Sequence, residues 1–187
     1  MMKKKSIIFF LIGGLVLSLW HCRKEESKQI ALNRVGQITG QTDYDGLKQL
    51  FPNDSVGHLE KTIGLETQRK VDIYDGKTKK RKLDIIYKQK GDTLQMLAVE
   101  VWDPSYRTAE GLNVQAPYGE WKKHYPISRV ETTLRHVVVF IPALNATLVF
   151  PYDALAQNAQ HNPSIKPDAD SIRPDAVPEV ITVFFEK

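Results

Sequence analysis

The chain has 187 residues, 26 of them basic and 22 acidic, and a single cysteine. This length suffices for one substantial core or two small ones, and one cysteine excludes an internal disulfide. Residues 1–21 contain three lysines and no acidic residue, so most of the net charge of +4 lies there. The rest is too balanced in charge to indicate nucleic acid binding, and we expect no nucleic acid partner.

The N-terminus has the pattern of a secretory signal. Lys3, Lys4 and Lys5 precede an uncharged, largely apolar run from Ile7 to Leu19. A membrane-spanning helix needs about 20 apolar residues, whereas a run of this length suits the apolar region of a signal peptide. We therefore predict that residues 1–21 are removed as a signal peptide.

The lone cysteine, Cys22, follows directly in the segment Leu19-Trp20-His21-Cys22. This segment resembles the lipobox of bacterial lipoproteins, in which a leucine stands three residues before a cysteine that is acylated. The resemblance implies lipidation of Cys22, with the membrane as a partner and an outer-membrane location, on the periplasmic or the cell-surface face. The alternative is a signal peptide that ends nearby and leaves a free thiol. Residues 22–34 are charged and polar and are expected to form a tether.

A first unit is predicted over 35–104. Thr42 has the position of a helix N-cap, apolar residues then follow at the spacing of one helical face, and Pro52 ends the helix. Alternating apolar residues and turn signals at Gly76 and Gly91 indicate three antiparallel strands. These strands are expected at 70–74, 82–87 and 97–102.

A second unit is predicted over 105–187. Pro117 is placed at the first position of a second helix, which a proline tolerates. Three more strands are expected at 137–141, 147–150 and 179–185. The segment 153–178 contains four prolines and little apolar periodicity. We expect this long insert to be a functional or disordered loop that the fold does not need.

The two units share a motif. Tyr44–Pro52 and Tyr118–Pro126 both follow the pattern Tyr-x-x-apolar-Lys-x-x-aromatic-Pro. This repeat predicts an α+β fold of two tandem helix-plus-antiparallel-sheet repeats that share one sheet. The duplicated unit resembles the β-lactamase inhibitory protein fold, whose relatives include small outer-membrane lipoproteins that assist β-barrel assembly. The resemblance covers most of residues 35–150 and implies a protein-binding role.

No catalytic pattern stands out. The sequence lacks a nucleophile elbow, a phosphate-binding loop and metal-ligand spacing among its histidines, so we expect a non-enzymatic protein with no metal and no cofactor. The candidate partner-binding residues are aromatic or basic: Tyr44, Tyr118, Lys79, Lys80 and Arg81. The aromatic residues also suit a core, and the basic cluster also suits a solvated hairpin turn.

The leading hypothesis is thus a lipid-anchored cell-envelope protein that binds another protein through its sheet. The alternative is a lipoprotein that binds a small ligand and uses the insert 153–178 as a lid. An enzyme of unfamiliar design is a third hypothesis, for which no pair of residues argues.

Overall fold

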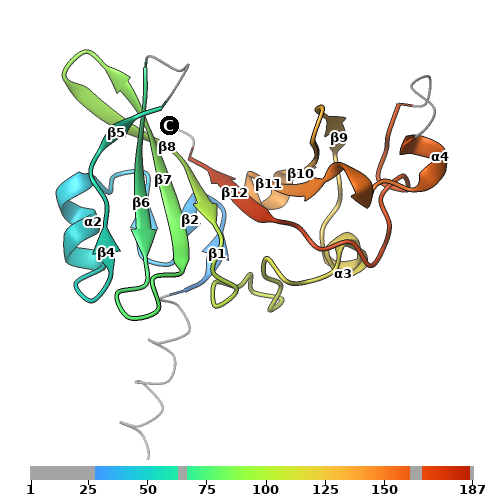
Figure 1. The fold of residues 1–187 in the computed structure, drawn as a ribbon, viewed down its shortest axis with the longest axis horizontal. Helices are drawn as coiled ribbons and strands as arrows, with labels where there is room; N and C mark the ends of the chain where they lie inside the picture. The colour runs from blue at the N-terminus through green and yellow to red at the C-terminus, as the bar shows by residue number, and fades with distance from the viewer. Residues whose placement is uncertain (1–27, 63–66, 161–165, 186–187) are drawn as a thin grey trace, which may run out of the picture.

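The computed structural model describes residues 28–62, 67–160 and 166–185. A nine-stranded antiparallel sheet dominates it (Figure 1). Its strands are β4 (Ser55–Val56), β5 (Glu60–Lys61), β6 (Gln68–Tyr74), β7 (Arg81–Lys90), β8 (Thr93–Val101), β9 (Arg129–Thr132), β10 (His136–Ile141), β11 (Ala146–Pro151) and β12 (Val180–Phe184). They are arranged in the order β4-β6-β7-β8-β12-β11-β10-β9, and β5 pairs with β6.

The six predicted strands are present, and so are the hairpins β6–β7 and β10–β11. Three short strands of the large sheet, β4, β5 and β9, were not predicted. Of these, β4 and β9 form because the chain leaves each helix alongside the first long strand of its half, and Val56 and Val130 then pair with Ile73 and Val139. The last strand, β12, lies in the middle of the sheet between β8 and β11. One continuous sheet therefore runs through both halves of the chain.

A separate three-stranded sheet precedes the first helix. Its strands are β1 (Ile30–Ala31), β2 (Arg34–Val35) and β3 (Ile38–Thr39). Their apolar side chains are buried, with Ile30 exposed by only 1%. The tether predicted over 22–34 is therefore wrong at its C-terminal end, because burying Ile30 and Val35 holds residues 30–35 against the core.

Two seven-residue helices carry the repeated motif: α2 (Tyr44–Leu50) and α3 (Tyr118–His124). The N-cap of α2 is Asp43, whose carboxylate accepts a hydrogen bond from the Gly46 N–H at 2.7 Å. The predicted cap, Thr42, instead accepts from the Thr39 N–H. Pro117 stands at the N-cap of α3, one position earlier than predicted, and caps nothing with its side chain.

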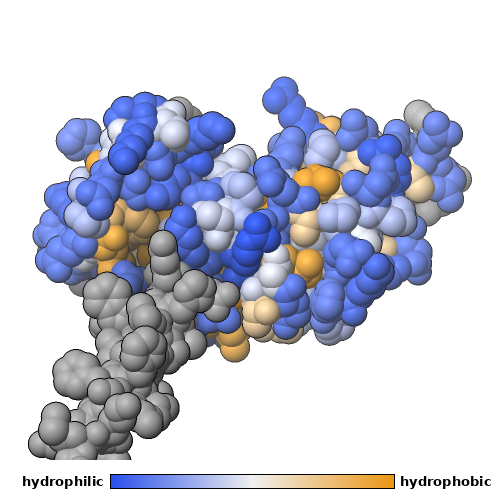
Figure 2. Space-filling model, turned by 90° about the horizontal axis from the view of Figure 1, so that it is seen from below, coloured by the Kyte–Doolittle hydropathy of each residue, from blue (hydrophilic) through white to orange (hydrophobic). Residues whose placement is uncertain are grey.

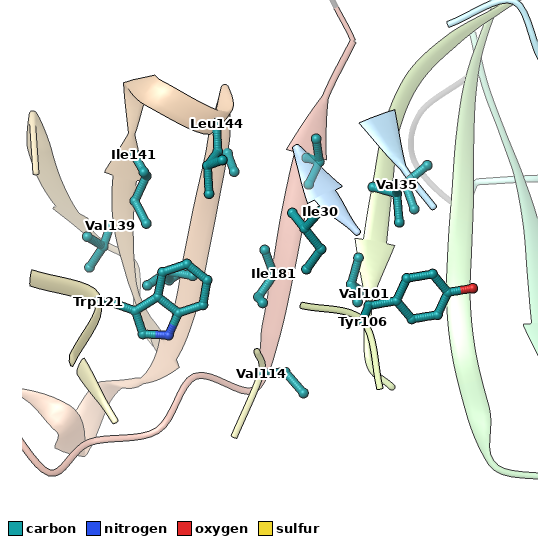
Figure 3. Close-up of a cluster of buried hydrophobic side chains, with 14 of the residues drawn as sticks. Ile30, Val35, Val101, Tyr106, Val114, Trp121, Val139, Ile141, Leu144 and Ile181 are labelled. Carbon is teal, nitrogen blue, oxygen red and sulfur yellow. The ribbon is translucent and has the colours of Figure 1, made fainter. Parts of the chain in front are cut away.

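The core lies between the helices and one face of the large sheet. Leu47 of α2 and Trp121 of α3 are both fully buried, as their shared place in the motif predicts. Figure 3 shows Trp121 beside Val139 and Ile141 of β10. The molecule is thus mostly antiparallel sheet with few helices, which agrees with the coarse α+β prediction.

The insert 153–178 departs from expectation, because its described parts pack into the core. Besides the helical turns η2 (Tyr152–Ala154) and α4 (Gln157–Gln160), its Leu155 and Ile172 form a β-bridge and are 0% and 3% exposed. A third helical turn, η1 (Pro142–Leu144), joins β10 to β11. The carbonyls of Pro174 and Ala176 accept hydrogen bonds from the first N–H groups of α3. The composition of the insert gave a wrong prediction. A few well-spaced apolar residues are enough to pack it against the core, because its backbone also accepts hydrogen bonds from α3, a helix that lacks a side-chain cap.

Candidate functional site: the second face of the sheet

The large sheet has a second face that carries a row of mainly polar side chains. Residues paired across neighbouring strands point to the same side of a sheet. The strand registers therefore define one row that crosses seven strands from β6 to β9: Asp72, Asp84, Glu100, Thr182, Thr147, Phe140 and Arg129. We call this row and its neighbours on the same side the second face.

On strands β6, β7 and β8, the side chains of the second face gather around a buried carboxylate. Asp84 is 0% exposed and accepts hydrogen bonds from the guanidinium of Arg81 and, at 3.2 Å, from the indole N–H of Trp102. The Lys70 ammonium lies 3.5 Å from Asp84 and 3.0 Å from Asp72. The Arg81 guanidinium also stacks 4.4 Å from the centre of the Trp102 ring. Charge pairing and stacking together hold these side chains in one arrangement.

Glu100 follows Asp84 in the row. Burial, and then a hydrogen bond to the Asp84 carboxylate, raise the pKa of Glu100 to about 7. Lys70 and Arg81 oppose this shift but are engaged with Asp72 and Asp84. The Glu100 carboxyl therefore keeps its proton to near-neutral pH.

The β12–β9 end of the second face carries hydroxyl and apolar groups. Thr182 and Thr147 are nearly buried, whereas Val138, Val149 and Phe140 are partly exposed. The Arg129 guanidinium lies 3.9 Å from the centre of the Phe140 ring. The face thus combines a charged end that contains tryptophan and arginine with a partly exposed apolar end.

The charged groups of the second face are mostly paired with one another. In the described ranges, no group of three histidine, cysteine, aspartate or glutamate side chains is placed to hold a metal ion. The carboxylates Asp72 and Asp84 are neutralised by cations, and no serine or cysteine lies in the row. The arrangement can offer shape, hydrogen bonds and a titratable carboxyl to a partner.

The structure separates the residues predicted to bind a partner. Tyr118 is 1% exposed, with its ring against Phe150 and its hydroxyl donating to the Ala169 carbonyl at 2.8 Å, so it belongs to the core. Arg81 belongs to the charged cluster rather than to a free turn. Lys79 and Lys80 are exposed on the β6–β7 turn, and Tyr44 is partly exposed, with Lys48 over its ring. Cys22 lies outside the described residues.

Sequence reasoning missed Asp84, Glu100 and Trp102 as members of a site. The alternation within each strand already placed Asp72 and Asp84 opposite the apolar residues of their strands. Only the register between strands shows that these polar positions form one row. That register brings Glu100 of β8 beside Thr182 of β12, far along the chain.

A cavity of about 370 Å³ lies where the insert meets β9. It is lined by residues 127–130 and, from the insert, by 166–169. Both Arg129 and Lys166 contribute to its wall.

Among the described residues, no helix has the length and apolar character needed to cross a bilayer.

Comparisons with known proteins give information about the fold alone. No family model matches the chain, and no curated protein is similar in sequence. The chain is similar to the crystal structure of the uncharacterized protein yfeY from Escherichia coli, with a TM-score of 0.53 and 12% sequence identity. The match covers 83% of this chain and 97% of that one. At this identity the likeness concerns the fold alone.

Proposed function

We propose that this chain is a non-enzymatic, lipid-anchored protein of the cell envelope that binds another protein through the second face of its sheet. The observation that carries the proposal is the continuous row from Asp72 to Arg129, which crosses the sheet beside partly exposed apolar side chains. Tryptophan, tyrosine and arginine dominate the binding energy of protein interfaces, and Trp102, Tyr74 and Arg81 lie together at one end of this face.

The proposal includes a tandem duplication related to the β-lactamase inhibitory protein fold. Each half runs from a seven-residue helix through a short edge strand to the centre of the sheet, ending in β8 or β12. The equivalent burial of Leu47 and Trp121 supports this reading. Joining two such halves at β8 and β12 produces one wide sheet, which is a larger docking surface than either half offers.

The interface is tested by photo-crosslinking in intact cells. A photoreactive residue at Val138, on the second face, should give one discrete adduct, and the same residue at Gln49, exposed on helix α2 on the other side of the sheet, should give none. Phe140→Arg, introduced beside the Val138 probe, should abolish the adduct without lowering the melting temperature. Equal labelling from both positions, or an adduct that survives Phe140→Arg, contradicts the proposed interface.

The anchor is tested at Cys22. Acyl chains contribute about 0.8 kcal/mol per buried methylene, and two chains hold a protein firmly on a membrane. Cys22→Ser should move the protein from the membrane fraction to the soluble fraction, or leave it unprocessed, and should remove labelling by a palmitate analogue. A variant that fractionates and migrates like the wild type rules out the anchor.

A second candidate function is small-ligand binding with the insert as a lid. The cavity between residues 127–130 and 166–169 favours it, because about 370 Å³ falls in the size range of small-molecule sites. Thermal-shift screening separates the two functions. A ligand that raises the melting temperature of the wild type but not of Arg129→Ala supports the cavity, and no stabilising ligand leaves protein binding as the better account.

A further inference from the structure

The turn between β6 and β7 presents cations that have no ion-pair partner in the described part of the chain. Lys77, Lys79 and Lys80 are all exposed, and their side chains form no salt bridge with a described residue. The next two basic residues differ, because Arg81 pairs with Asp84 and Lys82 lies 2.6 Å from Asp54. We call Lys77, Lys79 and Lys80 the basic turn.

The basic turn is held in a fixed conformation by Asp75. The Asp75 carboxylate accepts hydrogen bonds from the N–H groups of Lys77 and Thr78 at 3.0 and 2.7 Å, and from the Thr78 hydroxyl at 2.9 Å. The Lys79 N–H donates to the Asp75 carbonyl, and Lys79 has a φ of 57°. The Asp75 carboxylate faces the turn backbone. The turn therefore carries three lysine charges against one acidic charge, and its outer surface is positively charged.

The basic turn lies beside the point where the described chain begins. Asp54 accepts hydrogen bonds from the Gly76 N–H at 3.3 Å and from Lys82, and the cavity that Asp54 and Lys82 line also includes Lys28. Figure 1 shows the first coloured residues next to the green β6–β7 turn, at the lower end of the molecule. Figure 2, which views the molecule from below, shows that most of the visible surface at this end is hydrophilic.

We propose that the basic turn binds the anionic lipid headgroups of the membrane in which Cys22 is anchored, an orientation that rests on the proposed anchor. Only residues 23–27 separate Cys22 from Lys28. Even fully extended, this linker spans about 20 Å, at about 3.5 Å per residue. The lipid therefore keeps this end of the molecule near the headgroups, and the fixed turn brings its ammonium groups to the surface.

Two lysines at the other end of strand β7 supply a control for the basic turn. Lys88 and Lys90 are exposed near the β7–β8 turn, which Figure 1 places at the upper end of the molecule. A lysine near an anionic bilayer contributes about fivefold to membrane affinity. Neutralising two lysines of the basic turn should thus weaken binding about twenty-five-fold, while neutralising Lys88 and Lys90 should change it less than threefold.

The test uses the chain from residue 22 onward with Cys22→Ser, which removes the lipid and keeps every described residue. Its binding to phosphatidylcholine vesicles with 30 mol% phosphatidylglycerol is measured by co-sedimentation, with pure phosphatidylcholine vesicles as the uncharged reference. The variants are Lys77→Gln with Lys80→Gln, and Lys88→Gln with Lys90→Gln. Circular dichroism and thermal melts establish that both remain folded.

We expect binding to the anionic vesicles only, weakened by 0.5 M salt and weakened about twenty-five-fold in the basic-turn variant alone. Equal losses in both variants, or no binding to anionic vesicles, overturn the proposal. Because the protein here carries no lipid, the result is independent of the anchor test. Turn-dependent binding by a protein whose Cys22 is not acylated in cells refutes the anchor alone, and acylated Cys22 without turn-dependent binding refutes the basic turn alone.

Discussion

At the scale of single residues, the second face is governed by how its carboxyls are paired. Asp84 is fully buried yet surrounded by the donors of Arg81 and Trp102, so its charge is compensated. Burial and then the neighbouring Asp84 carboxylate raise the pKa of Glu100 to about 7, so it keeps its proton to near-neutral pH. Removing one partner of a buried pair leaves an uncompensated charge, which makes this end of the sheet sensitive to substitution and to pH.

Glu100 should make the stability of the protein depend on pH. Its pKa is raised in the folded state from an ordinary value of 4.5 to about 7, so between these values the folded chain binds more protons than the unfolded chain. Stability should therefore fall as the pH rises through this window. Glu100→Gln cannot ionise, and above pH 7 it should be more stable than the wild type by on the order of 1 kcal/mol.

Urea unfolding at several pH values from about 5 to 8 measures this effect. The matched control is Glu60→Gln, which removes an exposed carboxyl from β5. The control should keep the wild-type slope of stability against pH, whereas Glu100→Gln should flatten it. Parallel slopes in all three proteins would show that the Glu100 carboxyl does not titrate in this window.

At the scale of elements, short helices and a long insert depend on packing for their stability. Helices of seven residues are too short to be stable alone in water, so α2 and α3 persist through the apolar face each one buries. The insert depends in the same way on Ile172, Leu155 and the hydrogen bonds that its carbonyls accept from the start of α3. The stability of each of these elements therefore depends on how well it packs against the core.

Leu47 and Trp121 should be equivalent anchors of the two helices. Replacing either by Ala removes a fully buried side chain and should destabilise the fold by roughly 2–5 kcal/mol. The exposed neighbours Lys48 and Lys122 are matched controls, and their replacement by Ala should cost at most about 0.5 kcal/mol. Chemical denaturation measures all four. A loss below about 1 kcal/mol at either anchor would show that its helix is not held by that side chain.

The insert offers a sharper comparison, because a buried and an exposed β-branched aliphatic residue lie near each other in it. Ile172 is 3% exposed and Val177 is 44% exposed. Ile172→Ala should cost roughly 2–4 kcal/mol through the cavity it leaves, whereas Val177→Ala should stay within about 0.5 kcal/mol. Thermal unfolding distinguishes them. If the two variants melt together, the insert is dispensable for the fold, as its composition first indicated.

At the scale of the whole molecule, β12 determines whether there is one sheet or two. It pairs with β8 through Ile181 and Val183 and with β11 on its other side. Every other strand of the second half reaches the first half of the sheet only through it. Strand β12 therefore connects the two halves of the sheet. The row on the second face is continuous only because Thr182 lies between Glu100 and Thr147.

Ending the chain after Pro178 should abolish cooperative folding. The truncation removes β12 and exposes the edges of β8 and β11, two long apolar strands that are prone to pair with other chains. The expected product aggregates and shows no cooperative melt in calorimetry. Ending the chain after Phe185 is the control, since it keeps every described residue. A soluble truncated chain with a cooperative melt would mean that the two halves fold independently.

Local order was decided by the sequence alone. Alternation in 70–74, 82–87 and 137–141 is enough for strands because the side chains of a strand alternate between its faces. The apolar spacing after Thr42 and Pro117 predicts two short helices, and the shared motif correctly predicts that Leu47 and Trp121 are buried. These patterns lie in neighbouring residues, so the sequence alone predicts them, although the two short helices persist only through their packing.

Tertiary structure alone decided what depends on distant pairing. No local pattern places β12 between β8 and β11, since its β-branched residues suit a central strand and an edge strand alike. The burial of Tyr118 and Ile172 follows from α3 packing against the insert, which composition presented as a loop. Asp84 is buried with its charge compensated only because Arg81 and Trp102 close over it. The candidate site is likewise set by strand register, which the free energy of the whole core selects.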